Sequence, residues 1–169
     1  MPTCMSWSGT LRVLDASSAL HAWDNYPAAQ FPGLWAWLAT ELQRHQLAIP
    51  SVALEEVQHK APDCAAWLKA HGVPVLHIGN EVLQTALAIR ATIGVEADNY
   101  HPKGVDENDV LIIASAKARG AELVTNEGRQ FGKQAEARKC KIPAVCEIPA
   151  VGVANLNFLE YIKKSQQVF

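Results

Sequence analysis

Short apolar runs alternate with longer segments of helical periodicity, and this alternation limits the possible folds more than any other feature of the chain. The apolar runs have the lengths of strands. We expect strands at 11–14, 47–50, 73–78, 121–125 and 142–148. An alternation of strands and helices is typical of a parallel sheet that is covered by helices. The sequence therefore predicts an α/β fold of three layers, with a central, mostly parallel sheet of about four to five strands flanked by helices.

The segments between these runs carry apolar residues at helical spacing or begin at residues that cap helices. We expect helices from Ser17 toward Trp23, at 34–44, 51–60, 63–72, 81–93 and 106–120, and a closing helix at 155–164. Trp35 and Trp37 lie in one of these helices. We expect them to pack in the core and at its flank rather than to form a platform for stacked bases.

The length of 169 residues and a hydrophobic content of 49% predict one domain, residues 1–169, with a core that needs no disulfide. The four cysteines, Cys4, Cys64, Cys140 and Cys146, lack the short spacing of a zinc site or a secreted scaffold, so we expect reduced thiols. The first residues do not resemble a signal peptide, and no segment reaches the roughly 18 apolar residues of a membrane span. We therefore expect a cytoplasmic protein that does not contact a membrane.

Four acidic residues follow predicted strands or lie in the helices next to them. Asp15 ends the first strand, and Glu56 lies in the helix after the second. Asp109 opens an alanine-rich helix, and Glu127 follows the strand that ends at residue 125. Ligands of open parallel sheets bind outside the carboxyl ends of the strands, so we expect these four carboxylates to converge on one edge.

A cluster of carboxylates without matching cations repels itself, which implies a bound hard cation such as Mg²⁺ or Mn²⁺. Such an ion activates water and stabilises the charge that develops on a phosphodiester. The chain offers no cluster of cysteine and histidine, and the single ExxH pair of Glu56 and His59 is insufficient for a di-iron site.

Each acid also has an ordinary structural interpretation. Asp15 can cap the following helix, and Glu56 can be a solvated helix residue. Asp109 can stabilise the first turn of its helix through the macrodipole, and Glu127 can be a plain loop residue. Only their joint placement favours a functional site.

The same residues carry a resemblance to the PIN-domain family, which includes the VapC-type toxin ribonucleases. The segments that resemble the family motifs are LDASSAL at 14–20, IPSVALEEV at 49–57, DVLIIASA at 109–116 and LVTNE at 123–127. The similarity extends over most of the chain, and the segments occur in the family's order. The segments FPGLWAWL and KIPAVCEIPAVGV further indicate a bacterial subgroup.

The resemblance implies a PIN-like fold and a metal-dependent endoribonuclease. Asp15, Glu56 and Asp109 would be catalytic metal ligands, and Glu127 stands where the family usually has aspartate. The resemblance also implies that hydroxyl and amide side chains orient the carboxylates or contact metal-bound water and the substrate: Ser17, Thr125 and Asn126. The implied partners are an RNA substrate, a cognate antitoxin protein and a second copy of the chain.

A basic strip follows the last acidic motif. Its cations are Arg129, Lys133, Arg138, Lys139 and Lys141, against Glu136 alone. A formal net charge of −2 does not indicate a nucleic-acid binder, but a local basic patch can coexist with acidic catalytic residues. We expect the basic strip to hold RNA phosphates, with a solvated surface as the alternative.

Two other functions are compatible with parts of the sequence. In a haloacid-dehalogenase-like phosphatase, Asp15 would be the nucleophile, but Ser17 stands where such an enzyme has a second aspartate as its general acid. A non-catalytic PIN-like module that binds RNA or protein is the second alternative. Loss of an acid would favour it, yet three matching acids and a glutamate in the fourth position remain.

Overall fold

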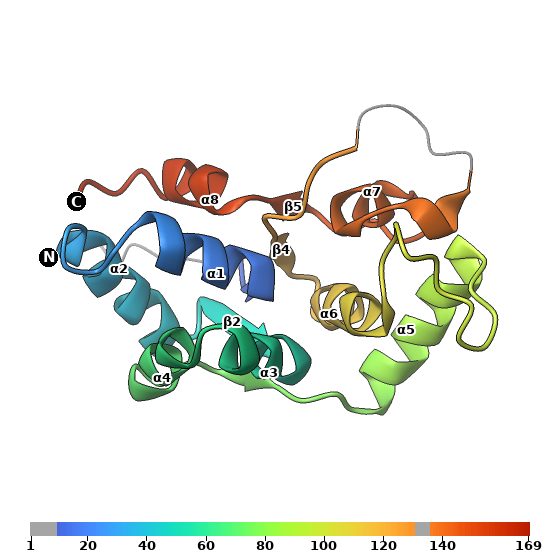
Figure 1. The fold of residues 1–169 in the computed structure, drawn as a ribbon, viewed down its shortest axis with the longest axis horizontal. Coiled ribbons are helices and arrows are strands. Elements are labelled where there is room, and N and C mark those ends of the chain that lie inside the picture. The colour runs from blue at the N-terminus through green and yellow to red at the C-terminus, as the bar shows by residue number, and fades with distance from the viewer. Residues whose placement is uncertain (1–9, 131–135) are drawn as a thin grey trace, which may run out of the picture.

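A computed structural model of the chain describes residues 10–130 and 136–169. Its centre is a five-stranded sheet of the order β3-β2-β1-β4-β5, in which every neighbouring pair is parallel. The strands are β1 (Arg12–Leu14), β2 (Leu47–Pro50), β3 (Val75–Leu76), β4 (Glu122–Val124) and β5 (Asn155–Leu156). The predicted α/β class with a mostly parallel sheet is confirmed (Figure 1).

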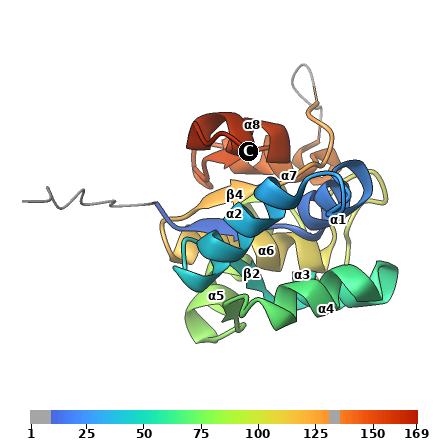
Figure 2. The same ribbon diagram turned by 90° about the vertical axis from the view of Figure 1, so that its left-hand side faces the viewer.

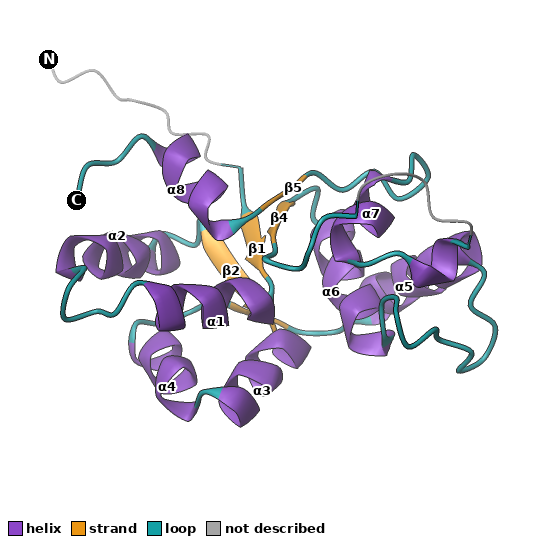
Figure 3. Cartoon of the chain, turned by 45° about the horizontal axis from the view of Figure 1, so that its top comes forward, coloured by secondary structure: helices purple, strands orange, loops and turns teal. Residues whose placement is uncertain are grey.

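Helices cover both faces of the sheet, which gives three layers. The helices are α1 (Ala16–Asn25), α2 (Pro32–Gln43), α3 (Ser51–Lys60), α4 (Pro62–Ala70), α5 (Asn80–Ile93), α6 (Glu107–Ala118), α7 (Ile142–Glu147), α8 (Phe158–Ser165) and a short 3₁₀ helix, η1 (Ala137–Lys139). Figure 3 shows the strands between α1, α2 and α8 on one side and α5, α6 and α7 on the other. In Figure 2, α1 and α2 lie in front, with α8 above them and α3 and α4 below.

The three central strands are short and almost entirely apolar because helices cover both of their faces. Val13, Ile49 and Leu123 have no exposed surface. In the register of the sheet, Val13 lies opposite Ala48 of β2 and Leu123 of β4. The order of the strands therefore places β1 between two strands that are far from each other in the sequence.

One predicted strand is wrong. The segment 142–148 forms helix α7 instead, with Ile142, Pro143, Val145 and Cys146 buried. These positions have the spacing of a helix face, and a proline in the first turn is favourable because it lacks only an N–H that has no helical partner. A short apolar run cannot be assigned to a strand or a buried helix from its periodicity alone.

The fifth strand of the sheet lies in the segment that the sequence predicts to be helical. Asn155 and Leu156 form β5, opposite Leu123 and Val124 of β4. The closing helix begins later, because Asn157 caps it: the side chain of Asn157 accepts a hydrogen bond from the backbone N–H of Glu160, and Glu160 returns one. The prediction of the closing helix is therefore correct in type and wrong in its first residues.

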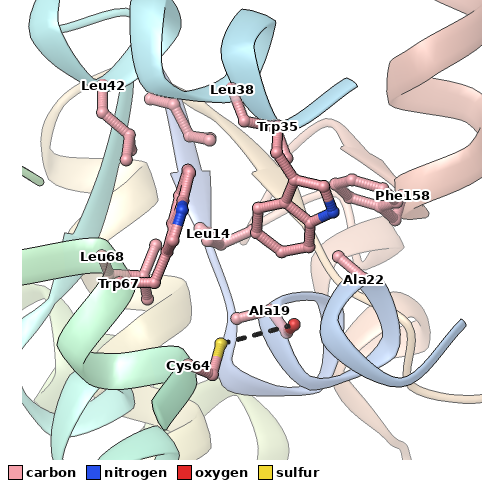
Figure 4. Close-up of a pocket in the computed structure, with 11 residues that line it drawn as sticks. Leu14, Ala19, Ala22, Trp35, Leu38, Leu42, Cys64, Trp67, Leu68 and Phe158 are labelled. Carbon is pink, nitrogen blue, oxygen red and sulfur yellow. Dashed lines mark hydrogen bonds between the residues drawn. The ribbon is translucent and has the colours of Figure 1, made fainter. Parts of the chain in front are cut away.

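A small apolar cavity of about 20 Å³ lies in the core beside β1 (Figure 4). Trp35 and Trp67 meet there edge to face, with ring centroids 4.7 Å apart. Trp35 is buried and Trp37 packs on Tyr161, so the prediction of a core and a flank tryptophan is confirmed. The cavity has room for about one water molecule and an apolar lining, so it cannot hold a substrate.

Three of the cysteines, Cys64, Cys140 and Cys146, are buried free thiols, as the sequence predicts, and Cys4 lies outside the described residues. Burial raises the pKa of the Cys64 and Cys146 thiols to about 12, so neither forms a thiolate at neutral pH. Within residues 10–130 and 136–169, no helix is both long and apolar enough to cross a membrane.

Candidate active site at the carboxyl ends of the strands

The carboxyl ends of β1 and β4 lie side by side because the two strands pair directly. Asp15 follows β1 and Thr125 follows β4. The backbone N–H of Asp15 donates to the carbonyl of Val124, 2.9 Å away, which joins the segments where the strands end. Two side chains that are 110 residues apart in the sequence are therefore in contact.

Two hydroxyl groups hold the carboxylate of Asp15. Ser17 Oγ lies 2.5 Å and Thr125 Oγ1 lies 2.9 Å from the same oxygen, Oδ2. The backbone N–H of Asn126 donates to Ser17 Oγ, and that of Glu127 donates to Thr125 Oγ1. Each hydroxyl thus accepts one of these hydrogen bonds and donates its own proton to Asp15. The two hydroxyls fix Oδ2, and a backbone hydrogen bond from Ala16 further stabilises the carboxylate.

Asp15 has only 3% of its surface exposed. Burial raises the pKa of this carboxyl group, the hydroxyls of Ser17 and Thr125 lower it, and the charge of Glu56 raises it. Asp15 stands at the N-cap position of α1, but its side chain makes no capping hydrogen bond. The helix-cap interpretation therefore does not explain why a carboxylate is buried here.

Asn126 connects the strand ends to the helices around them. Its Oδ1 accepts hydrogen bonds from Ser18 Oγ (2.7 Å) and from the backbone N–H of Phe158 (3.0 Å), at the start of α8. A backbone amide can only donate, so the oxygen of the side chain must face it. The NH₂ group of Asn126 is then left as a donor. Its predicted contact with water or substrate stays a prediction.

Asp109 lies in the first turn of α6 and takes part in a reciprocal cap with Asp106. Asp109 Oδ2 accepts from the backbone N–H of Asp106 (3.0 Å), and Asp106 Oδ1 accepts from that of Asp109 (2.8 Å). Burial, opposed by this hydrogen bond and reinforced by the charges of Asp106, Glu127 and Asp15, raises the pKa of Asp109 to about 8. Asp109 is thus a cap and, at the same time, a carboxylate that other carboxylates destabilise.

Glu56 and Glu127 complete the set of predicted acids. Glu56 Oε1 lies 2.6 Å from Lys60 Nζ, one turn further along α3. Glu127 is half-buried, and burial raises the pKa of its carboxyl group, with further increases from Asp15, Asp106 and Glu56. The charges of the four predicted acids therefore affect one another's pKa. Glu56 raises the pKa of Asp15, and Glu127 and Asp15 raise that of Asp109. Asp15 and Glu56 raise the pKa of Glu127.

The chemistry of these donors fits a hard divalent cation, since all are carboxylate oxygens and their mutual repulsion is relieved by positive charge. Their spacing does not yet fit: in the described parts of the chain, no three side chains of histidine, cysteine, aspartate or glutamate are arranged to hold one ion. Two of the acids have local partners: Glu56 pairs with Lys60, and one oxygen of Asp109 accepts from the backbone N–H of Asp106.

The basic strip is partly neutralised within the molecule: two carboxylates pair with three of its four described cations. Arg129 pairs with Glu160 at 2.6 Å, and Glu136 pairs with Arg138 at 3.3 Å and Lys139 at 3.5 Å. Lys133 lies outside the described residues. Lys141 is exposed, and its charge lowers the pKa of Glu127, so it lies within electrostatic range of the acids.

Three residues around the acids are not among the predicted site residues. Asp106 shares the cap with Asp109, Ser18 holds Asn126, and Lys60 pairs with Glu56. The sequence contains a signal for two of them. Asp106 precedes Asp109 by the three residues of a capping box, and Lys60 follows Glu56 by the four residues that bring helical side chains together. No local pattern indicates that Ser18 reaches Asn126.

No curated protein matches the sequence. A chain in the crystal structure of VapBC2 from Rickettsia felis, bound to a DNA fragment from their promoter, is similar with a TM-score of 0.54 and 20% identity. The match covers 88% of this chain and 98% of that chain, and it shows a shared fold that is consistent with a PIN-like architecture. Residues 13–169 match the family model described as "Domain of unknown function (DUF4411)", and the chain therefore belongs to this family.

Proposed function

We propose that this chain is a PIN-like, metal-dependent endoribonuclease that hydrolyses RNA phosphodiester bonds with Mg²⁺ or Mn²⁺. The observation that carries the proposal is the state of Asp15. Its carboxylate is buried at the carboxyl edge of the sheet, with one oxygen fixed by Ser17 and Thr125 and the charges of other acids beside it. Such a burial of negative charge is unfavourable unless a cation compensates it.

The proposed roles follow from these contacts. Asp15, Glu56, Asp109 and Glu127 would bind the cation, and Ser17 and Thr125 would keep Asp15 in one orientation. A bound divalent cation supplies Lewis-acid stabilisation of the reacting phosphodiester and makes water a better nucleophile. The NH₂ group of Asn126 is proposed as a donor to water or to the substrate backbone, because its oxygen is already engaged. Among the described cations of the basic strip, Lys141 would be the one that contacts phosphate, because it is exposed and the other three are paired with Glu136 or Glu160.

We further propose that the chain is the toxin of a toxin–antitoxin pair, with a cognate antitoxin as its protein partner. The support is the shared fold with a chain of VapBC2, a structure that also contains promoter DNA. The proposal treats residues 1–169 as one domain.

One observation favours a second function, a non-catalytic PIN-like module that binds RNA or protein. The described residues contain no preassembled group of three metal ligands, and glutamate stands at position 127. The two proposals differ in one respect that an assay can measure, which is hydrolysis of RNA.

The test is cleavage of labelled single-stranded RNA by the purified protein in Mg²⁺ or Mn²⁺, with and without EDTA. We expect cleavage that requires the metal and stops in EDTA. Asp15→Asn should lower the rate more than about 100-fold, because changes in the groups around a metal ligand alone cost about 10–100-fold. Asp63→Asn, a change of the same type at an exposed residue of α4, should cleave like the wild type.

The Asp15→Asn protein, purified in the same way, also controls for a contaminating ribonuclease. Cleavage that survives the chelator, or equal rates for the wild type and Asp15→Asn, would contradict the nuclease proposal. If several RNAs bind but stay intact in both metals, the non-catalytic module is the better description.

A further inference from the structure

A lysine stands among the carboxylates of the candidate active site. Lys60 lies in the last turn of α3, and its Nζ is 2.6 Å from Glu56 Oε1. The two side chains keep 55% and 34% of their surface exposed, so the ammonium group is at the protein surface rather than in the core. Glu56 is one of the proposed metal ligands, and its nearest charge is thus already a cation.

Lys60 differs from an ordinary lysine on a helix surface because its charge interacts with carboxylates of other elements as well as with that of its own helix. Helix α3 packs against α1, which begins next to Asp15, and against α6, whose first turn contains Asp109. The carboxylates of Asp15 and Asp109 act on the ammonium of Lys60 in addition to that of Glu56. Lys69 offers a comparison: its Nζ donates to the neutral amide of Gln58 at 2.9 Å.

We propose that Lys60 is the internal counter-ion of the carboxylates, that it competes with the divalent cation for Glu56, and that it contacts the substrate phosphate once the cation is bound. This inference rests on the proposed metal site. It explains a feature of the described structure, namely that no three acids are assembled around one point. When Lys60 pairs with Glu56, the negative charge of the acids is partly neutralised, and no cation at a common point draws the carboxylates together.

The competition follows from charge. A divalent cation attracts the carboxylate of Glu56 and repels the ammonium of Lys60, so the ion pair must open when the cation binds. The pair is exposed, and its opening is therefore a modest cost rather than a barrier. The released ammonium stays on a flexible stem at the edge of the site, where an RNA phosphate arrives. Lysine is suited to bind phosphate as a point charge.

The test compares Lys60→Met with Lys69→Met and Lys60→Arg. Methionine keeps an unbranched apolar stem and a high helix propensity, so both methionine variants should fold. Mn²⁺ affinity is measured by calorimetric titration without RNA. We expect Lys60→Met to bind Mn²⁺ about three- to tenfold more tightly than the wild type, a range that corresponds to the loss of an exposed ion pair and its repulsion. Lys69→Met and Lys60→Arg should bind like the wild type.

Cleavage of RNA at saturating Mn²⁺ is the second measurement. We expect kcat/KM of Lys60→Met to fall about tenfold, since one contact to phosphate is lost. Tighter metal binding together with slower cleavage is a combination that neither misfolding nor loss of a plain helix ion pair produces.

Three results would overturn the inference. Unchanged or weaker Mn²⁺ binding by Lys60→Met would show that Lys60 does not compete for Glu56. Cleavage that is unchanged or faster at saturating Mn²⁺ would exclude a contact with phosphate. Absence of Mn²⁺ binding by the wild type would refute the metal site itself and this inference with it. Calorimetric titrations at two temperatures establish it before any variant is made, because a binding enthalpy of zero at one temperature is then not mistaken for absence of binding.

Discussion

Asp109 is both a helix cap and a member of the acidic cluster, two roles that the sequence offers as alternatives. Its Oδ2 accepts the backbone N–H of Asp106 in a reciprocal cap, while burial and the neighbouring acids raise its pKa to about 8. A cap that used only favourable charge would lower the pKa of a carboxyl group. The raised value indicates that this carboxylate is held where its charge is unfavourable in the metal-free protein.

We therefore predict that Asp109→Asn melts at the same or a higher temperature than the wild type in EDTA. Asparagine keeps the accepting oxygen of the cap but loses the charge. The folded-state pKa of Asp109 lies above its unfolded value near 3.8, so its contribution to stability is fully present below pH 4 and is lost as the pH rises through 8. The advantage of the variant should thus be smallest near pH 4 and grow toward pH 9, where it reaches about 2–4 °C, the effect of about 1 kcal/mol in a chain of this size.

The response to metal provides the control for this prediction. Mn²⁺ should raise the melting temperature of the wild type, because a ligand of the native state stabilises it, and the rise should be smaller for Asp109→Asn. A variant that loses stability in EDTA at pH 9 and responds to Mn²⁺ like the wild type would show that Asp109 is only a cap.

At the scale of elements, the loop from 94 to 105 and the 3₁₀ helix η1 form one packed unit next to α6. The backbone N–H of Val105 donates to the carbonyl of Cys140, and Arg138 donates to the carbonyl of Asn99 at 2.9 Å. Arg138, one of the predicted RNA-binding residues, thus holds this loop. A Cβ atom on Gly104 would come within 1.8 Å of the carbonyl oxygen of Arg138. The contact explains why a glycine stands immediately before Val105 and the cap of α6.

Gly104→Ala should destabilise the protein by about 1–3 kcal/mol, since the added methyl group meets backbone that has to shift. In a chain of this length, that loss lowers the melting temperature by roughly 2–4 °C for each kcal/mol. Gly128→Ala is the matched control, because a Cβ there would meet nothing within 4 Å. Equal melting temperatures for the two variants would mean that the loop and η1 do not pack as described.

Two segments near the C-terminus form elements of a different type from the predicted ones. The segments 142–148 and 155–164 each contain an apolar run that fits a strand or part of a helix. The predicted type is wrong for 142–148, which forms a helix, and for Asn155 and Leu156, which form a strand. The proline at position 143 was the available signal for a helix start. What makes Asn155 and Leu156 a strand is the free edge of β4, which no local pattern contains.

At the scale of the whole molecule, the charge of the basic strip depends on partners from other elements. Glu160 of α8 pairs with Arg129, and Arg138 and Lys139 share the single carboxylate of Glu136, so a net positive charge remains. The sequence shows five cations against Glu136 alone, and it does not reveal that Glu160 lies beside them. RNA phosphates would have to replace these pairs, which leaves Lys141 as the best-placed contact among the described cations.

We predict that the double variant Lys139→Glu and Lys141→Glu binds RNA more weakly and with a flatter salt dependence. Each lost contact to single-stranded RNA reduces the slope of log K against log salt by about 0.7, so two lost contacts reduce it by about 1.4. Filter binding in EDTA, at several salt concentrations, measures both effects without cleavage. A double variant of Lys69 and Lys163 to glutamate, at exposed positions elsewhere, controls for net charge. If both double variants have the slope of the wild type, the basic strip is a solvated surface.

The sequence by itself determines the fold class and the chemistry that is available at the strand ends. Apolar runs separated by helices predict a helix-covered parallel sheet, because buried strands need apolar residues on both faces. Asp15, Ser17, Thr125 and Asn126 follow the strands in short motifs, and local order is enough to predict that they lie at one edge of the sheet. Their roles in catalysis, and the unity of residues 1–169 as one domain, stay predictions.

Only the tertiary structure decides which of these groups touch. Thr125 reaches Asp15 because β4 pairs with β1 in one register, and the amide of Phe158 reaches Asn126 because β5 adds to the free edge of β4. Lys60 pairs with Glu56 within one helix, but only the packing of α1 and α6 brings further carboxylates within electrostatic range of it. The hydrogen bonds from Thr125 and Phe158 join residues that are 110 and 32 positions apart. They arise from strand pairing and helix packing, so no pattern confined to one segment of the sequence can contain them.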